Sequence, residues 1–432
     1  RKSYSSEIGL RTHGGNSRRH PQKGMRLYAR SEYGNKKFRH PFFKNQETQE
    51  FKRLVLKPMS ASWNDSGMQD LIANQMALNP ELNFIGLQNE PVVVYLNGVY
   101  WGVYLLQERL DEYFIEEHFD LEDDEFDLIG NWYGAVNTGS NTEWLQLYDF
   151  ISTHELSEPD HFEYVSSLID IDNFIDYQIF QSFIANQDWP ANNMMCWKKH
   201  GAGNKWQWIF KDGDGGFQER ELNFMNHSLS TSDEFWPTNA YTTLFLRKLI
   251  ENPTFEDQFY TRLTHLINNF WRYQDMGPLY DKAMIDFHDE IIEQNLRFPV
   301  IADYSEWLSA IDQVNHFMQV RACNLQSQLS EDLNKTITVP ECYLPETDVD
   351  QLEVYPNPSD GAFYIYFEST LSKNLLIRIK NSQGQLIEDI PFPASHGENR
   401  VGLSQLGLPP GLYIIEVKAD QHSEVCKLII SG

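Results

Sequence analysis

The sequence predicts a large α+β domain followed by a small all-β domain. Three observations favour this division. Alternating strands joined by glycine turns fill residues 1–107, and amphipathic helical patterns with a β-hairpin among them follow as far as residue 338. A stretch rich in Pro, Glu and Asp forms a predicted linker over 339–350, and short alternating strands recur over 351–432. At 432 residues the chain is long enough for a large core and a second module.

Charge limits the classes of partner. The formal net charge is −27, which argues against nucleic-acid binding because phosphate contacts need a basic surface. Residues 1–60 nevertheless hold 15 Lys or Arg against 4 Asp or Glu. A basic segment facing an acidic remainder suits a cleft for a polyanion such as a nucleotide with its metal, although a solvated charged surface explains the charge equally well. No apolar run approaches membrane-spanning length, so we expect no transmembrane segment.

The four cysteines have no metal-ligand spacing and form no disulfide framework. A Cys323–Cys342 bridge in an oxidising compartment is an open alternative. The chain starts at Arg1 on what reads as a strand, so we expect a fragment that lacks its true N-terminus.

The first residues predict two strands, Ser6–His13 and Lys23–Arg30, joined by the turn Gly14-Gly15-Asn16-Ser17-Arg18. Backbone N–H groups of such a glycine turn can contact phosphates, but an ordinary hairpin has the same pattern. Phe51–Lys57 reads as a further strand, and Asp65–Asp70 as the start of a helix. Asn97-Gly98 predicts a type I′ hairpin between flanking strands.

Residues 174–217 carry the main functional pattern. Asp188 precedes Asn193 by five residues, and Asp212 and Asp214 follow on a glycine-rich turn. In phosphoryl transfer one Asp orients the attacking hydroxyl, an Asn five residues later holds a metal ion, and an Asp on a downstream turn holds Mg²⁺. A hairpin of Met194–His200 with Lys205–Phe210 would bring the two segments together.

Two other interpretations of this stretch are open to test. Asp212-Gly-Asp214 resembles the start of an EF-hand loop, but Asn223 stands at the twelfth position, where a bidentate acid is needed, so we reject it. Asp188 and Asn193 could also do no more than cap turns, as Asp and Asn often do.

Three motifs, Asp-Trp-Pro-x-Asn-Asn from Asp188, Trp-x-Trp-x-x-x-Asp-x-Asp-x-Gly-Phe from Trp206, and the upstream Gly-Gly-Asn-Ser, resemble the CotH family over about residues 5–330. This resemblance implies an atypical protein-kinase-like bilobal domain over 1–338, with a β-rich small lobe of about 1–107 and a helical large lobe of about 108–338. It also implies ATP with Mg²⁺ or Mn²⁺ as cofactors.

The resemblance suggests roles for residues of the first hundred or so positions. Gly14, Gly15, Asn16 and Ser17 would contact the nucleotide phosphates together with Lys23 or Arg26. Asp70 would pair with the phosphate-binding cation, or favour the helix dipole. Glu108 would contact the base or sugar, or pair with Arg109 on the surface.

Helical patterns complete the large lobe. His161–Ile184 predicts one or two helices with Asp172 as an N-cap and a buried stripe that supports the Asp188 loop. Thr238–Trp271 and Leu279–Leu333 are long amphipathic patterns interrupted at Pro253, Pro278 and Pro299. The acidic run Glu116–Asp127 reads as a solvated loop.

From Leu352 onward seven short strands predict a β-sandwich: 352–355, 362–367, 375–381, 385–390, 400–403, 411–418 and 425–430. Val354-Tyr355-Pro356-Asn357-Pro358-Ser359, Gly411-Leu412-Tyr413-Ile414 and the closing Lys427-Leu428-Ile429-Ile430 resemble the C-terminal sorting domain of the type IX secretion system of Bacteroidetes. The resemblance implies handling by that secretion machinery and a protein that is secreted or attached to the outer cell surface. An immunoglobulin-like adhesion module is the alternative.

Together these patterns predict a secreted atypical kinase that transfers the ATP γ-phosphoryl group to Ser or Thr of a protein at the cell surface or outside the cell. Asp188 would be catalytic, and Asn193, Asp212 and Asp214 would bind metal. One alternative is a surface adhesin or pseudokinase without phosphotransfer. Another is a different transfer on the same scaffold, such as nucleotidyl transfer or glutamylation.

Overall fold

The computed structural model describes residues 3–44, 49–58, 67–131, 134–218, 222–234, 238–288, 290–299, 304–339, 349–369, 373–404, 406–419 and 422–431. Two compact units divide the chain: one holds Arg1–Ile311 and Arg321–Pro340, and the other holds Asp312–Val320 and Glu341–Gly432. Most of the predicted linker, Cys342 and the predicted helix start at Asp65 lie outside the described residues. The Cys323–Cys342 bridge therefore stays a prediction.

A five-stranded antiparallel sheet forms the N-terminal part of the first unit. Its order is β1 (Gly9–His13), β2 (Gly24–Tyr28), β5 (Arg53–Pro58), β7 (Val99–Glu108) and β6 (Asn89–Leu96). The turn at Asn97, with φ of 51°, and Gly98 joins β6 to β7, as the Asn-Gly pair predicts. Between β1 and β2 the 3-10 helix η1 (Asn16–Arg19) replaces the simple turn that the sequence predicted.

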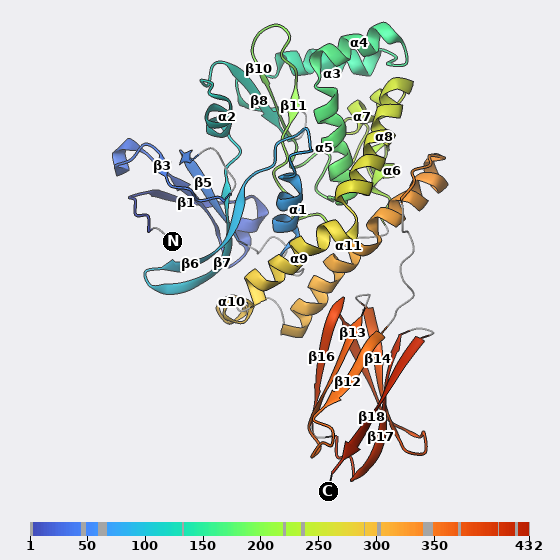
Figure 1. Cartoon of the computed structure of the whole chain (residues 1–432). Coiled ribbons are helices and arrows are strands. Elements are labelled where there is room, and N and C mark those ends of the chain that lie inside the picture. The colour runs from blue at the N-terminus through green and yellow to red at the C-terminus, as the bar shows by residue number, and fades with distance from the viewer. Residues whose placement is uncertain are drawn as a thin grey trace. The chain divides into compact units, whose positions relative to one another are not determined.

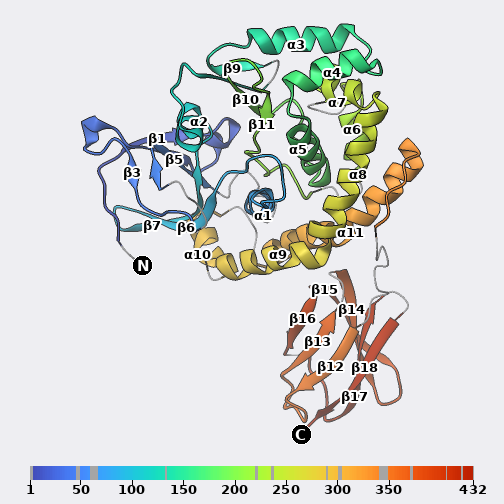
Figure 2. The ribbon, with the colours of Figure 1, turned by 45° about the horizontal axis from the view of Figure 1, so that its top comes forward.

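Small elements complete this part of the unit. η2 (Ser31–Tyr33), β3 (Phe38–Arg39) and β4 (Glu50–Phe51) precede β5, and helix α1 (Gln69–Ala77) follows it. Phe38, Phe43, Phe51, Leu54 and Leu106 form one buried cluster against the sheet. Figures 1 and 2 show the sheet on one side of α1 and helix α5 on the other.

A second sheet lies within residues 108–338, which the sequence predicted to be helical apart from one hairpin. Its order is β11 (Gln207–Trp208), β10 (Met195–Lys199), β8 (Phe126–Gly130) and β9 (Ala135–Thr138). The predicted hairpin is present, with Cys196 opposite Trp208. β8 was missed because the acidic run before it hides an apolar strand; in the structure α2 (Glu112–Phe119) and a short loop occupy most of that run.

Helices build the rest of this unit: α3 (Thr142–Thr153), α4 (Pro159–Leu168), α5 (Ile171–Phe183), α6 (Phe224–Ser228), α7 (Leu244–Leu249), α8 (Pro253–Phe270), α9 (Tyr273–His288), α10 (Ile291–Arg297) and both ends of α11 (Tyr304–Leu333), whose segment Asp312–Val320 belongs to the second unit. The N-cap of α5 is Asp170, whose carboxylate accepts from Asn173 N at 3.2 Å, so the prediction of Asp172 was wrong. Pro253 begins α8, as expected, but Pro278 lies inside α9 and does not interrupt it.

The second unit contains a C-terminal all-β region. β12 (Val349–Tyr355), β13 (Phe363–Ser369) and β16 (Gly397–Leu403) form one sheet, and β15 (Leu386–Ala394), β14 (Lys373–Asn381), β17 (Gly411–Ala419) and β18 (His422–Ile430) form another. Alternate apolar residues of both sheets, among them Ile365, Ile377, Ile415 and Leu428, form one buried cluster. Each strand that the sequence predicted here is present. No helix among the described residues is long and apolar enough to cross a membrane.

Candidate functional site

A cavity of about 940 Å³ in the first unit collects most of the residues that the sequence singled out. We call it the cleft. Its walls come from the five-stranded sheet, the end of β7, the loop that follows α5, and the turn that follows β11. Asp188, Asn193, Asp212 and Asp214 all line the cleft. Residues far apart in sequence therefore share one polar cavity.

Lys57 is the centre of the charge arrangement. It lies near the end of β5, and its ammonium Nζ is 2.5 Å from Asp212 Oδ1, 2.8 Å from Asp70 Oδ2 and 3.8 Å from Asp214 Oδ2. Burial opposes the charge on Lys57, but the three carboxylates outweigh this effect and raise the pKa of Lys57 well above its usual value. Lys57 is thus a firmly charged group that links the sheet, α1 and the Asp212 turn.

The three carboxylates differ in protonation preference. Burial raises the pKa of Asp212, but the charge of Lys57 more than compensates and leaves that pKa below its ordinary value. Burial and the nearby charge of Asp212 raise the pKa of Asp214 well above its ordinary value. Burial likewise raises the pKa of Asp70, against the attraction of Lys57. Asp212 is therefore the carboxylate that stays ionised most readily, and Asp214 the one that most favours its protonated form.

Helix α1 and the Asp212 turn are joined directly. Asp70 Oδ1 accepts from Gly213 N at 2.8 Å and from Asn74 Nδ2 at 3.0 Å. A Cβ on Gly213 would lie 2.2 Å from the Cβ of Ala73, closer than real atoms approach. Only glycine therefore lets the turn come this close to α1.

The Asp188 loop is held by amide side chains. Asn186 donates to the main-chain oxygen of Asp212 at 2.9 Å, and its Oδ1 accepts from Asp188 N at 3.2 Å. Asn193 Nδ2 donates to Asp188 Oδ2 at 3.3 Å. Burial and the charge of Asp212 raise the pKa of Asp188. Asn186 therefore connects the Asp188 loop with the Asp212 turn, and Asp188 lies in an environment that increases its basicity.

Helix α5 and Arg321 support the Asp188 loop. Phe174, Ile179, Phe180 and Phe183 of α5 are buried. Arg321 of α11 donates to the main-chain oxygens of Ser182 at 2.6 Å, Phe183 at 2.8 Å and Leu222 at 3.0 Å. The carbonyls of Ser182 and Phe183 lie at the end of α5, where main-chain acceptors have no partner inside the helix, and Leu222 lies just before α6. Arg321 thus fixes the point from which the Asp188 loop starts.

Cationic side chains line the part of the cleft formed by the sheet and β7. Arg26 contacts His13 Nδ1 at 2.9 Å and donates to Tyr28 OH at 3.1 Å. Burial and then the charge of Arg26 lower the pKa of His13 to about 4, so His13 is neutral near neutral pH. Arg109 pairs with Asp111, and Lys211, next to Asp212, also lines the cleft. Arg26, Arg109 and Lys211 therefore add positive charge to the lining of the cleft.

The remaining predicted residues fall in different places. Gly14, Gly15 and Ser17 line the cleft beside η1; Asn16 begins η1. Lys23 is not among the described residues that line the cleft, and its ammonium donates to Arg18 O at 2.6 Å. Glu108 lines the cleft, but its carboxylate accepts from Gln88 N at 2.9 Å and contacts His118 Nε2 at 2.8 Å.

Lys57, Asn186 and Arg321 were not predicted as site residues from the sequence. The predicted order of a strand ending at Lys57 and a helix starting near Asp70 was the available signal for an ion pair. Local pattern does not show that β5 lies between β2 and β7, where Lys57 lines the cleft. No local pattern marks Arg321, because its carbonyl partners are far away in sequence.

The side-chain oxygens of Asp212 and Asn193 are of the chemical type that binds a divalent cation. Mg²⁺ prefers carboxylate and amide oxygens and usually takes one or two carboxylates, with waters and substrate phosphates as its other ligands. Asp212 and Asn193 supply such oxygens. In the described part of the chain, no group of three or more His, Cys, Asp or Glu residues has an arrangement suited to a metal ion. Asp212 and Asn193 are thus the residues of the cleft that could hold such an ion.

Comparisons with known proteins identify two segments. A family model described as CotH kinase protein matches residues 10–325, and a model described as secretion system C-terminal sorting domain matches residues 353–431. No curated protein matches the chain. The crystal structure of dimeric latent PorU from Porphyromonas gingivalis matches with 18% identity over 22% of this chain and 10% of that chain, at a TM-score of 0.18, which establishes no common fold.

The first match spans most of the chain, and this chain belongs to the CotH family. The second match identifies a type IX sorting domain, which indicates a protein delivered to the cell surface or outside the cell.

Proposed function

From its place in the CotH family, we propose that this protein is a secreted kinase that transfers the γ-phosphoryl group of ATP to a Ser or Thr hydroxyl of a protein. The observation that carries the proposal is the Lys57 cluster, in which one cation contacts Asp70 of α1 and Asp212 of the downstream turn at the edge of a large cleft. Protein kinases use this set of parts: a strand Lys paired with a helix acid, an Asp and Asn loop, and a metal-binding Asp.

The proposal includes the finer fold description. The five-stranded sheet with α1 would be the small lobe of a kinase-like domain, and the part from α2 to α11 the large lobe. The C-terminal strands would form an immunoglobulin-like sandwich. In this scheme the cleft between the sheet and the Asp188 loop takes the nucleotide.

Each side chain would have a defined task. Lys57, Arg26 and Arg109 would neutralise phosphate oxygens. Asp188, whose pKa burial raises, would orient the acceptor hydroxyl and take its proton. Asp212 and Asn193 would hold a divalent cation, Mg²⁺ or Mn²⁺, which would supply charge neutralisation at the transferred phosphoryl group when bound.

Lys57 replaces Lys23 and Arg26 as our first candidate for the cation that pairs with the helix acid. Lys23 donates to the Arg18 carbonyl and is not among the described residues that line the cleft. Glu108 would contribute to the cleft wall through its contacts with Gln88 and His118, not through a contact with the base or sugar. Nucleotide binding would need Lys57 to exchange part of its contact with Asp212 for phosphate.

Intact-mass measurement after incubation with ATP, Mg²⁺ or Mn²⁺ and a Ser-rich protein tests the reaction type. We expect the mass gain of phosphate, lost in Asp188→Asn. Asp257→Asn is the matched control, because Asp257 is exposed on α8 and does not line the cleft. A gain of nucleotide mass would replace phosphotransfer by nucleotidyl transfer, and a folded protein that binds ATP but modifies nothing would favour a pseudokinase.

A further inference from the structure

We propose that three arginines at the edge of the cleft bind an acidic segment of the acceptor protein. This inference rests on the proposed kinase function and names a class of acceptor for it. The three residues are Arg11 in β1 and Arg18 and Arg19 in η1, and all of them are exposed. We call them the basic rim.

The basic rim belongs to a segment without acidic residues. Residues 9–30 hold six Lys or Arg and no Asp or Glu, although the whole chain has 62 acidic and 35 basic residues. Among the described residues, no carboxylate forms an ion pair with an arginine of the rim. Arg53, Arg109 and Arg262, in contrast, each pair with an aspartate. The positive charge of the rim is therefore not balanced within the described part of the chain.

Arg11 also faces a second cation. It lies directly opposite Arg26 in the antiparallel pair of β1 and β2. Side chains at opposite positions project from the same face of the sheet, and like charges placed there repel each other. Among the described residues Arg26 contacts the side chains of His13 and Tyr28, neither of which has a carboxylate. An anionic group bound beside Arg11 would reduce this repulsion.

The short helix η1 connects the rim with the cleft. Gly15 and Ser17 line the cleft, whereas Arg18 and Arg19 follow them directly and are exposed outside its described lining. Asp188 lines the same cavity. The rim thus lies at the edge of the space proposed for the nucleotide, not inside it. An anion bound at the rim therefore belongs to a ligand that extends beyond the cleft, as an acceptor chain does.

The chemistry of the rim selects carboxylates. The guanidinium group is a planar fork of donors that matches a carboxylate and can bind it through two hydrogen bonds. Cations in the last turn of a helix also favour its dipole, but this explanation does not apply to Arg11, which lies in a strand. Asp or Glu residues beside the acceptor Ser or Thr would pair with the rim while the hydroxyl enters the cleft.

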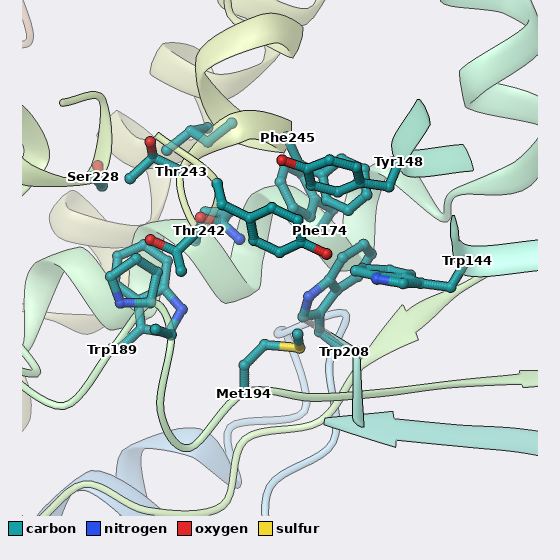
Figure 3. Close-up of a pocket in the computed structure, with 16 residues that line it drawn as sticks. Trp144, Tyr148, Phe174, Trp189, Met194, Trp208, Ser228, Thr242, Thr243 and Phe245 are labelled. Atoms are coloured by element: carbon teal, nitrogen blue, oxygen red, sulfur yellow. The ribbon is translucent and has the colours of Figure 1, made fainter. Parts of the chain in front are cut away.

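A second cavity of the first unit offers acidic side chains no such match. It has a volume of about 50 Å³, and Trp144, Tyr148 and Trp208 are among the residues that line it (Figure 3). None of its described lining residues is charged. Moving a carboxylate into such surroundings without a partner costs free energy. Acidic residues of an acceptor are therefore matched at the basic rim and not in this aromatic cavity.

Fluorescence anisotropy with the full chain tests this inference without turnover. The probe is the labelled peptide Glu-Glu-Glu-Ser-Glu-Glu-Glu, compared with the same peptide with Gln at every Glu. We expect the acidic peptide to bind at least about tenfold more tightly at low ionic strength, and added salt to reduce this difference because it screens exposed charges.

Variants of the rim locate the binding. Arg11→Gln combined with Arg19→Gln should weaken binding of the acidic peptide by about fivefold, since exposed ion pairs contribute little individually. Lys199→Gln combined with Lys205→Gln is the matched control, because both lysines are exposed, neither is in the described lining of the cleft, and the net charge changes equally. Equal binding of the two peptides, or equal weakening in both double variants, would overturn the inference.

Two other sources of the anion are separate outcomes. Tighter binding of an oligogalacturonate with the same number of carboxylates would assign the rim to an anionic glycan and overturn the inference. Weaker binding of ATP with Mg²⁺ by the rim variant than by the control would assign the arginines to the nucleotide, with the same consequence.

Nucleotide binding by the wild type separates a failure of this inference from a failure of the proposed function. Acidic-peptide binding that the rim variant weakens, without any binding of ATP in the presence of Mg²⁺, would retain the basic rim as a peptide site and reject the kinase. ATP binding and phosphotransfer with no preference for the acidic peptide would retain the kinase and reject this acceptor class.

Discussion

Two cations of the first unit, the partly buried Lys57 and the fully buried Arg321, have different surroundings. Lys57 faces the cleft and contacts the carboxylates of Asp70 and Asp212. Arg321 lies in the interior and donates to the main-chain oxygens of Ser182, Phe183 and Leu222. Burial lowers the pKa of Lys57, but the carboxylates outweigh this effect and raise that pKa well above its usual value, whereas burial alone lowers the pKa of Arg321 to about 9.

This difference distinguishes a cation that belongs to the binding site from a cation that supports the loop beside it. A cation held by side-chain carboxylates at the edge of a cavity can exchange them for phosphate oxygens. A cation held by main-chain carbonyls, two of them at the end of α5, contacts the backbone itself and keeps it in position. We infer that Lys57 serves binding and that Arg321 serves the position of the Asp188 loop. The following predictions test this distinction, in order of expected size.

Replacing Lys57 should affect the reaction most. Lys57→Met removes the charge while keeping much of the side-chain volume. We expect phosphotransfer to fall by about a thousandfold or more, which corresponds to about 4 kcal/mol of activation free energy. Initial rates with a fixed acceptor measure the loss, and urea unfolding verifies that the variant is folded. A folded variant with near-normal rates would remove Lys57 from the site.

Replacing Arg321 should affect stability most. Arg321→Met leaves buried carbonyl oxygens without their donor, and we expect a loss of about 3–5 kcal/mol in the free energy of unfolding. Arg272→Met is the control, because Arg272 is partly exposed and pairs with Asp275 at 3.1 Å, a surface contact that contributes less than about 1 kcal/mol. Urea unfolding of both variants gives the comparison. Equal losses would show that Arg321 has no special supporting role.

The close approach of Gly213 to α1 gives a smaller effect. Gly213→Ala would place a Cβ 2.2 Å from that of Ala73, and we expect a cost of about 1–3 kcal/mol with weakened nucleotide binding. Adding Ala73→Gly should recover part of the loss, since the two methyl groups compete for one space. Gly277→Ala in α9 is the control, because its Cβ would meet no atom closer than 3.6 Å. Strictly additive effects of the two changes would contradict the proposed contact.

The buried carboxyl group of Glu117 should make the stability of the first unit depend on pH. Burial raises the pKa of Glu117 from 4.5 to about 7, partly opposed by Lys37 at 3.6 Å. The unfolded chain loses this proton at lower pH than the folded chain, so the associated stability is complete below the unfolded pKa and is lost as pH rises through about 7. Glu117→Gln should therefore be more stable than wild type by about 2 kcal/mol near pH 8, and the difference should shrink near pH 4. Thermal unfolding at both pH values measures it. A constant difference would exclude Glu117 as the source.

Local pattern predicted much of the fold. The alternation of residues 352–430 predicted the strands of the C-terminal all-β region, and the runs Met194–His200 and Lys205–Phe210 predicted the hairpin of β10 and β11. These elements follow from the order of neighbouring side chains and from turn residues. The predicted residues Asp188, Asn193, Asp212 and Asp214 line one cleft, and their roles stay predictions.

Contacts between residues far apart in the sequence could not be predicted from local pattern. Lys57 becomes part of the cleft only because β5 lies between β2 and β7, and strand order is not encoded in local alternation. The partners of Arg321 lie more than a hundred residues earlier for Ser182 and Phe183. Helix α9 continues through Pro278, where local preference alone predicts a break, because tertiary packing outweighs that preference.

The measurement that tests the central claim most directly is calorimetric titration of ATP with Mg²⁺ or Mn²⁺ into the full chain and into Asp212→Asn. Asp257→Asn again serves as the control for loss of one negative charge. We predict metal-dependent nucleotide binding in wild type and in the control, and its loss in Asp212→Asn. Absence of nucleotide binding in folded wild-type protein, or equal binding in Asp212→Asn, would contradict the assignment of the Lys57 cleft as a nucleotide site.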